Sequence, residues 1–157
     1  MTTDSRNLNT GAARSDANVV PAGGRAGAAV IVAHIARILL GLIFFIFGLN
    51  AFVLFIPPPP VVPPFVQQFT SVEYASHFVY LPASVQVVCG LMLLANQWVP
   101  LAIVTLAAVL ANILWFHITM FPAGIPPAIV AFILWFVVAW SIRASFTPLL
   151  VRKPTYR

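Results

Sequence analysis

Four long apolar stretches, separated by short polar or proline-rich segments, dominate the pattern along the chain. The first stretch, residues 28–56, contains a single formally charged side chain, that of Arg37. About 20 apolar residues, rising ~1.5 Å each in a helix, cross the hydrocarbon core of a bilayer. The pattern therefore predicts four membrane-spanning helices, at about residues 30–55, 75–95, 99–120 and 127–145.

The segments between these spans are turns and one longer loop. Prolines crowd residues 57–64, whereas residues 96–98 and 121–127 are short enough to be tight turns. Pro82 marks either a kink or the first turn of the second span, because proline lacks the amide hydrogen that a helix interior needs. Consecutive helices joined by short turns pack antiparallel. The predicted fold is an all-α integral membrane protein, an antiparallel four-transmembrane-helix bundle.

The two ends of the chain differ from this membrane domain, which we place at residues 29–147. Residues 1–28 are rich in small and polar side chains and carry almost no large apolar group. Such a segment cannot bury enough surface to order itself, so it is predicted to be a disordered cytoplasmic tail. Residues 148–157 are predicted to be a short basic cytoplasmic tail.

Composition and charge placement support a membrane protein with both termini in the cytoplasm. Of the 157 residues, 61% are hydrophobic and only 7% are charged, too few to coat a soluble globule. All eight Lys and Arg lie before or early in the first span, or at and beyond the end of the fourth. An excess of basic residues marks cytoplasmic segments. Because no basic residue is interleaved with aromatics on a soluble face, the expected partner is the lipid bilayer rather than nucleic acid.

Four polar side chains within or at the edge of the spans are candidate ligand contacts: Asn50, His77, Asn112 and His117. At ~1.5 Å per residue, Asn112 lies near the midplane and the other three lie roughly 10 Å toward the outside. Imidazole and amide groups can donate hydrogen bonds to quinone carbonyls, and polar groups within a membrane are functional candidates. Alternatively, Asn50, Asn112 and His117 bond across helices and fix the bundle, at about 0.6 kcal/mol each.

Helical geometry limits this candidate site. Asn112 and His117 are five residues apart, about 140° around an ideal helix, so one compact ligand is not expected to contact both. Thr105, Asn112 and Thr119 recur every seven residues and lie on one face of the third span.

A second group of residues is predicted to have structural roles: Arg37, Gly41, Gly48, Pro82 and Gln86. The first three share one stripe with His34, and this stripe is predicted to face protein, because glycines let another helix approach closely. Arg37 either snorkels to the headgroups or pairs with backbone carbonyls.

The sequence predicts no catalytic residue and no metal site. It contains no HExxH motif, no CxxC motif and no carboxylate-rich cluster. The single cysteine, Cys89, is interpreted as a small buried apolar side chain. The serines lack a base arranged to activate them.

Several phrases, taken together in order, resemble the DoxX-like family of four-span bacterial membrane proteins. They are ARILLGL at 36–42, Gly48-Leu49-Asn50, YLP at 80–82, GLMLL at 90–94, VPLA at 99–102, NILWFH at 112–117 and PAGIPP at 122–127. The similarity covers about residues 33–150. The sequence departs from the family's usual pattern at Gln86, where relatives often carry an acidic residue, and at Gln97, where a basic residue is common.

The resemblance implies a location in the bacterial cytoplasmic (inner) membrane and a link to redox biology. Relatives include the small membrane subunit of a thiosulfate:quinone oxidoreductase. The expected function is therefore a membrane anchor or quinone-facing subunit of a redox assembly, with quinone as the candidate cofactor and a soluble oxidoreductase as the candidate partner.

Two alternative functions stay open: a transporter for a small solute, and a non-catalytic scaffold or assembly factor. Four spans with one buried charge offer little for a polar pathway unless the protein forms a homo-oligomer.

The predicted orientation can be tested by labelling. A cysteine introduced by Gln67→Cys, in the loop after the first span, is expected to react with a membrane-impermeant reagent added from outside. Labelling only from the cytoplasmic side would contradict the orientation.

Overall fold

The computed structural model describes residues 22–150. Of the predicted N-terminal tail, residues 1–21 lie outside this range, and so do residues 151–157 of the predicted basic tail. The first helix begins at Ala22, earlier than the predicted start of the span at about residue 30.

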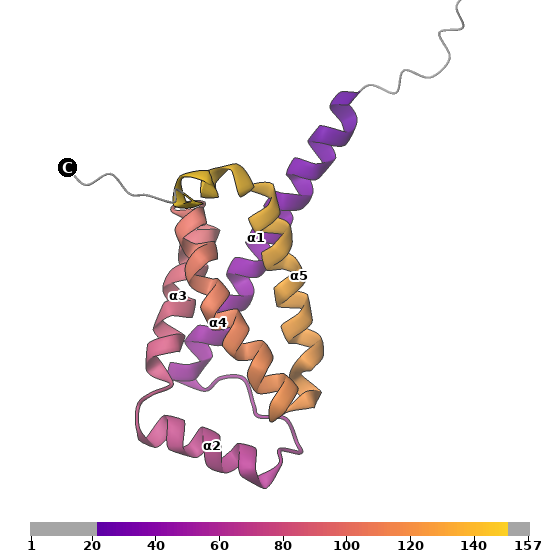
Figure 1. Ribbon diagram of the computed structural model, residues 1–157. Helices are drawn as coiled ribbons and strands as arrows, with labels where there is room; N and C mark the ends of the chain where they lie inside the picture. Colours follow the sequence, from indigo (N-terminus) through magenta and orange to yellow (C-terminus); the bar gives the residue numbers. More distant parts are fainter. Residues whose placement is uncertain (1–21, 151–157) are drawn as a thin grey trace, which may run out of the picture.

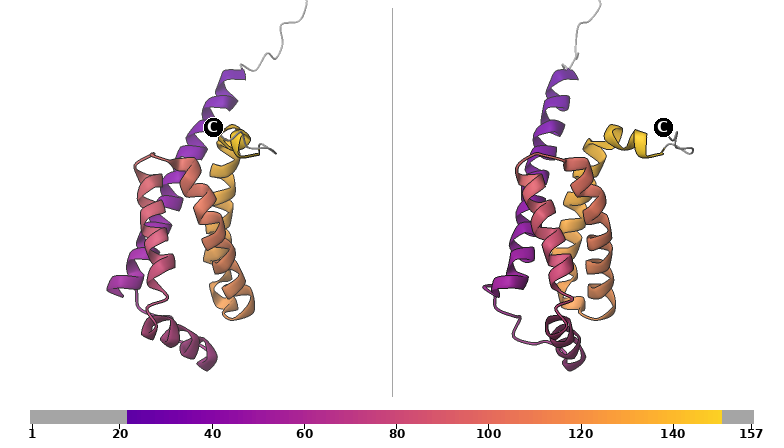
Figure 2. Two further views of the ribbon diagram at one scale, coloured as in Figure 1. Left: turned by 60° about the vertical axis from the view of Figure 1, so that its left-hand side comes forward. Right: turned by 90° about the vertical axis from the view of Figure 1, so that its left-hand side faces the viewer.

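All regular structure in residues 22–150 is helical, which confirms the predicted fold class. The elements are α1 (Ala22–Val53), α2 (Pro64–Ala75), α3 (Tyr80–Leu94), α4 (Val99–Thr119), η1 (Pro122–Gly124), α5 (Ile125–Ser141) and η2 (Arg143–Leu150). The helices α1, α3, α4 and α5 run side by side, and α2 lies across one end of the bundle (Figure 1). At the other end α1 extends beyond its neighbours in all three views (Figure 2). We call these the α2 end and the α1 end.

Three segments are long and apolar enough to cross a membrane, and α3 provides a fourth if it is counted together with α2. The three are Gly27–Val53, Val99–Thr119 and Pro122–Ser141. The helix α3 has only 15 residues, and it meets α2 at an angle of 81°. The chain is thus a multi-pass membrane protein whose second predicted span corresponds to α3.

The break between α2 and α3 explains two features of the sequence. Pro82 lies in the first turn of α3, where a missing amide hydrogen costs little, so it starts a helix rather than kinking one. His77 lies in the break with a positive φ of 61°. It therefore does not share a helical face with Glu73, four residues earlier.

Helices α1 and α3 pack closely because small residues face one another along both. A Cβ atom added to Gly90 of α3 would lie 2.7 Å from the Phe45 backbone nitrogen and 2.9 Å from the Gly41 carbonyl oxygen. A Cβ atom at Gly48 would lie 2.8 Å from Cβ of Gln86 and 3.0 Å from the Ala83 carbonyl oxygen. Gly41 and Gly48 thus face protein at the closest contact between two spans.

The rest of the core is apolar and joins all four long helices. Leu40 and Phe44 of α1, Leu93 of α3 and Leu106 of α4 are at most 2% exposed. Cys89 is 4% exposed within the same cluster, as the sequence predicts. One side-chain hydrogen bond links α5 to α4: the Trp135 Nε1–H donates to the Ile103 carbonyl oxygen at 2.9 Å.

The α1–α3 contact predicts a difference between two glycine-to-alanine substitutions. Gly90→Ala forces a methyl group against the α1 backbone, and overpacking of this kind costs about 1–3 kcal/mol. Gly27→Ala is the matched control, because nothing lies within 4 Å of a Cβ atom there. Thermal unfolding in detergent micelles should show a lowered midpoint for Gly90→Ala only. Equal midpoints for the two variants would contradict the close approach.

Candidate functional site

The four predicted ligand contacts do not come together in the structure. Asn50 closes the loop that follows α1, because its Oδ1 accepts a hydrogen bond from the Ile56 amide at 2.7 Å. His77 is exposed, and its ring centroid lies 5.6 Å from that of Tyr80. Asn112 is exposed on α4 and makes no side-chain hydrogen bond within residues 22–150.

His117 is held by the turn between α4 and α5. Its Nδ1 lies 3.2 Å from the Phe121 carbonyl oxygen. A Cβ atom added to Gly124 would lie 2.1 Å from the His117 ring, so glycine is needed for the imidazole to pack there. The His117 side chain thus contributes to the structure of the turn between α4 and α5.

Aromatic side chains at the α2 end form two separate clusters, each with one histidine, and α2 contributes a ring to both. Tyr74 of α2 lies edge-on to Tyr80, with centroids 6.5 Å apart. Phe69 of α2 lies 5.8 Å from Phe116, the neighbour of His117. The predicted outer polar layer is therefore divided between two aromatic packing sites.

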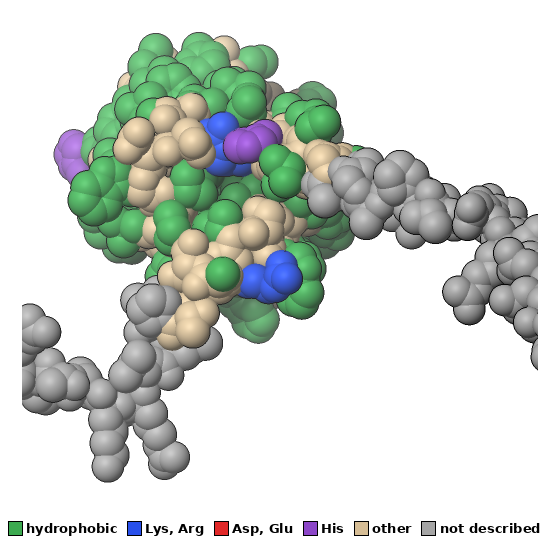
Figure 3. Space-filling model, turned by 90° about the horizontal axis from the view of Figure 1, so that it is seen from above, with side chains coloured by type: hydrophobic (Ala, Val, Ile, Leu, Met, Phe, Trp, Pro, Cys, Tyr) green, Lys and Arg blue, Asp and Glu red, His purple; other side chains and the backbone are tan. Residues whose placement is uncertain are grey.

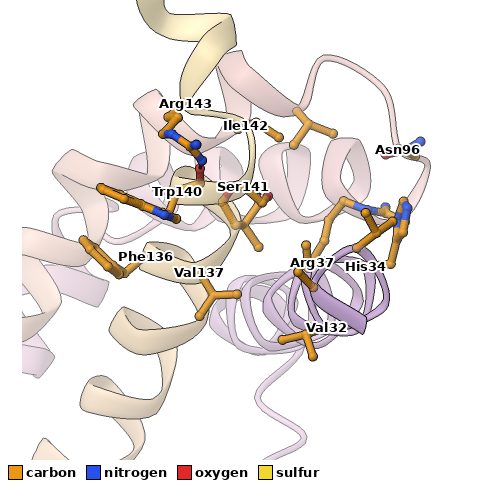
Figure 4. A pocket seen from close by; sticks show the side chains of 15 residues that line it. Val32, His34, Arg37, Asn96, Phe136, Val137, Trp140, Ser141, Ile142 and Arg143 are labelled. Carbon is orange, nitrogen blue, oxygen red and sulfur yellow. Dashed lines mark hydrogen bonds between the residues drawn. The ribbon is translucent and has the colours of Figure 1, made fainter. Parts of the chain in front are cut away.

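A cavity of about 700 Å³ lies instead at the α1 end, between α1 and α5 and beside the turn that joins α3 to α4. We call it the inner pocket. Its apolar walls include Val32, Val137 and Phe136, and its polar or aromatic lining comprises His34, Arg37, Asn96, Trp140, Ser141 and Arg143. Figure 4 shows His34 and Arg37 on the α1 side, near Asn96, with Arg143 and Trp140 across the pocket on the other side. Because Val32 and Phe136 are each more than half exposed, the pocket reaches the outer surface of the bundle.

Arg37 caps the end of α3. Its Nη1 donates to the Leu93 carbonyl oxygen and lies 3.5 Å from that of Leu94. The last carbonyls of a helix lack intrahelical partners, and the C-terminal end of the helix dipole favours a cation. Of the two predicted roles for Arg37, the structure shows the pairing with carbonyls. Its Nε is enclosed and has no partner among the described residues.

The turn after α3 places Asn96 near Arg37. The Asn96 backbone has a φ of 55°, a left-handed conformation that asparagine tolerates better than most residues. The Gln97 amide then donates to the Met92 carbonyl oxygen at 2.9 Å, which completes a Schellman cap.

Arg143 closes the far side of the inner pocket. Its guanidinium carbon lies 5.2 Å from the centroid of the Trp140 ring, and its Nη1 donates to the Trp140 carbonyl oxygen at 3.1 Å. The side chain is otherwise exposed. It retains free donors that could reach a ligand.

The electrostatics of the α1 end are positive. Glu73 on α2, at the opposite end, is the only acidic residue between positions 22 and 150. Figure 3, which looks onto the α1 end, shows basic and histidine side chains among apolar ones, and no acidic side chain from residues 22–150 on that face. The inner pocket therefore favours a group that accepts hydrogen bonds or carries negative charge.

The sequence indicates which charged and polar residues lie toward this end of the bundle, but it does not predict that they line one pocket. By helical rise, the predicted spans place Arg37, His34 and Arg143 toward the cytoplasmic side. That α1 and α5 are neighbours there, with the α3–α4 turn beside them, depends on tertiary packing. The sequence offers one signal of the pocket: Trp140 and Arg143 lie three residues apart near the end of the fourth predicted span.

Comparison with known proteins identifies one family. The family model described as DoxX matches residues 32–118, which is more than half of the chain. No curated protein matches the chain, and no solved structure does.

The cap predicts that Arg37 matters for stability even without a ligand. Arg37→Gln shortens the side chain so that the α3 carbonyls lose a charged donor, which should lower the free energy of unfolding by about 1–3 kcal/mol. Arg143→Gln is the matched control, because an exposed arginine changes stability by about 0.5 kcal/mol or less. Denaturant unfolding in micelles measures both variants. A stable Arg37→Gln protein would show that the cap is dispensable.

Proposed function

The chain belongs to the DoxX family, and we propose that it is a quinone-binding membrane subunit of a redox assembly. One observation carries the proposal: a largely apolar cavity that reaches the outer surface of the bundle and has hydrogen-bond donors on opposite sides. The family resemblance adds the link to quinone chemistry.

The residues of the inner pocket fit a quinone. A quinone has an apolar ring and tail and two carbonyl oxygens that only accept hydrogen bonds. Val32, Val137 and Phe136 provide apolar walls. His34 and Asn96 supply donors on one side of the cavity, and Arg143 supplies donors on the other. A small number of placed polar groups in an otherwise apolar cavity is typical of ligand sites. When bound, the quinone would supply the redox chemistry, and the chain would hold and orient it.

The proposed site differs from the one expected from sequence. At the α2 end, the side-chain oxygen of Asn50 and one His117 nitrogen already pair with the backbone, and neither residue lines the inner pocket. At the α1 end, most donors of Arg143 and those of Asn96 have no partner among the described residues. These donors line the same cavity, so one ligand can use them.

The same end of the bundle suggests where a partner would bind. Basic residues favour the cytoplasmic side, so the proposed orientation places the inner pocket at the cytoplasmic face of a bacterial inner membrane. A soluble oxidoreductase docked there would be adjacent to the quinone. In this assembly the chain serves as anchor and acceptor site, with no catalytic residue of its own.

The pocket predicts saturable binding of a short-chain quinone. Quinones quench tryptophan fluorescence, so the test protein carries Trp98→Phe and Trp115→Phe, which remove the two most exposed indoles. Quenching should then report mainly on Trp140, and Trp140→Phe should abolish most of it. His34→Ala combined with Arg143→Gln should weaken binding roughly tenfold, because hydrogen bonds to charged groups contribute about 1.5–3 kcal/mol.

The control for this experiment is Asn50→Ala, at the far end of the bundle, which should leave the affinity unchanged. Equal affinity in the double variant and the starting protein would overturn the assignment of the pocket. Displacement of the quinone by an anionic phospholipid, but not by a zwitterionic one, would show that the cations select a phosphate group, and the quinone proposal would then fail.

A further inference from the structure

The outward face of α4 carries a regular stripe that is exposed at every position except the half-buried Thr105. The stripe alternates in steps of four and three residues and consists of Leu101, Thr105, Ala108, Asn112, Trp115 and Thr119. Trp115 is 68% exposed and Leu101 is 55% exposed. The opposite face of α4, with Leu106 and Leu110, is buried in the core. We call the outward face the Asn112 stripe.

Asn112 is a polar residue on a surface that is expected to face lipid. It lies in the middle part of a 21-residue span, only about 5 Å from the helix midpoint by helical rise. Its amide carries two N–H donors and a carbonyl acceptor, and none of them pairs within residues 22–150. An amide moved into hydrocarbon without a partner is costly.

Two other polar side chains on the exposed helix surfaces form hydrogen bonds within their own helix. Thr119 donates to the Trp115 carbonyl oxygen at 2.7 Å, and Ser84 donates to that of Tyr80 at 2.7 Å. Asparagine differs because its two donors cannot both be used by its own helix. Thr105, the remaining polar residue of the stripe, is half-buried, so Asn112 is the exposed group of the stripe that requires a partner from outside the fold.

We propose that this partner is a second copy of the same chain, and that two α4 helices pair through the Asn112 stripe. Copies in one membrane share an orientation, so two α4 helices related by a two-fold axis along the membrane normal are parallel. Each residue then meets its own counterpart at the same depth. An amide both donates and accepts, so Asn112 complements Asn112 of the second copy.

The remainder of the stripe fits close pairing of two helices. Ala108, one turn before Asn112, is small enough for the two backbones to approach. The spacing of four and three residues keeps the stripe on one side of a left-handed helix pair. A different membrane protein would need a polar group at this same depth, whereas a second copy brings one by construction. The inference does not depend on the proposed quinone function.

The test compares the dimer fractions of the full-length protein and two variants in lipid vesicles. Energy transfer between donor- and acceptor-labelled copies is measured as the protein-to-lipid ratio is lowered. Asn112→Leu should raise the dissociation constant about 3- to 20-fold, the range expected for interhelical hydrogen bonds in membranes. Asn112→Gln keeps the amide and should retain most of the dimer. Because position 112 is exposed, both variants should unfold at the wild-type temperature.

Cross-linking locates the interface independently. In a Cys89→Ala background, Ala108→Cys retains Asn112 and should form an intermolecular disulfide on oxidation. Ile133→Cys on α5 is the matched control, since Ile133 is 55% exposed near the middle of its own helix, and it should form no intermolecular disulfide.

Three results would overturn the proposal. They are a wild-type protein that stays monomeric at every protein-to-lipid ratio, Asn112→Leu dimers as stable as those of wild type, and cross-linking at position 133 rather than at 108. Protection of Asn112 only in native membranes, with monomers in pure lipid, would mean that another protein covers the stripe, which would also overturn it.

Discussion

The close approach of α1 and α3 is the constraint on which the rest of the structure depends. Lipid tails are as apolar as the helix surfaces, so helices in a membrane associate through tight packing and hydrogen bonds rather than through the hydrophobic effect. Gly41 and Gly90 remove the side chains that would otherwise separate the two backbones. Arg37 lies one turn before Gly41, and this short separation lets its guanidinium reach the carbonyls at the end of α3. The helix contact and the cap thus form one unit, and this unit holds Asn96 and Arg37 at one side of the inner pocket.

Some polar groups in this protein form hydrogen bonds within the fold, whereas others have donors that remain available to a ligand. At the α2 end, Asn50 and His117 pair with backbone groups four to six residues away in sequence. These contacts close loops, but the amide donors of Asn50 have no partner among the described residues. At the α1 end, Asn96 and Arg143 also have donors without a partner in residues 22–150, and there they line one cavity. The two ends therefore differ in the cavity that brings the donors together rather than in the presence of free donors.

The sequence predicts the spans more directly than it predicts a site, for physical reasons. Hydropathy is a local property, so the long apolar runs and the turn at Asn96 follow directly from it. The packing role of Gly41 and Gly48 follows from the helical face that they share. The separate helix α2 does not follow, because a short, moderately apolar segment after prolines can equally be an interfacial loop. The inner pocket depends on which helices become neighbours, since residues about 100 positions apart, such as Arg37 and Arg143, line it together. Depth along the membrane normal shows which residues share a layer, but it does not show which of them line the same pocket.

The surfaces assigned to binding lie on different parts of the bundle and do not compete. The inner pocket is lined by α1, α5 and the start of α4 at Val99, and it shares no residue with the Asn112 stripe. Two copies paired through α4 therefore each retain the lining of their own pocket. Because pairing would occur about a two-fold axis along the membrane normal, both pockets would lie at the same depth and open at the same face. A single soluble partner, or two of them, would then meet two equivalent sites, while the polar group that lipid cannot satisfy would be buried between the copies.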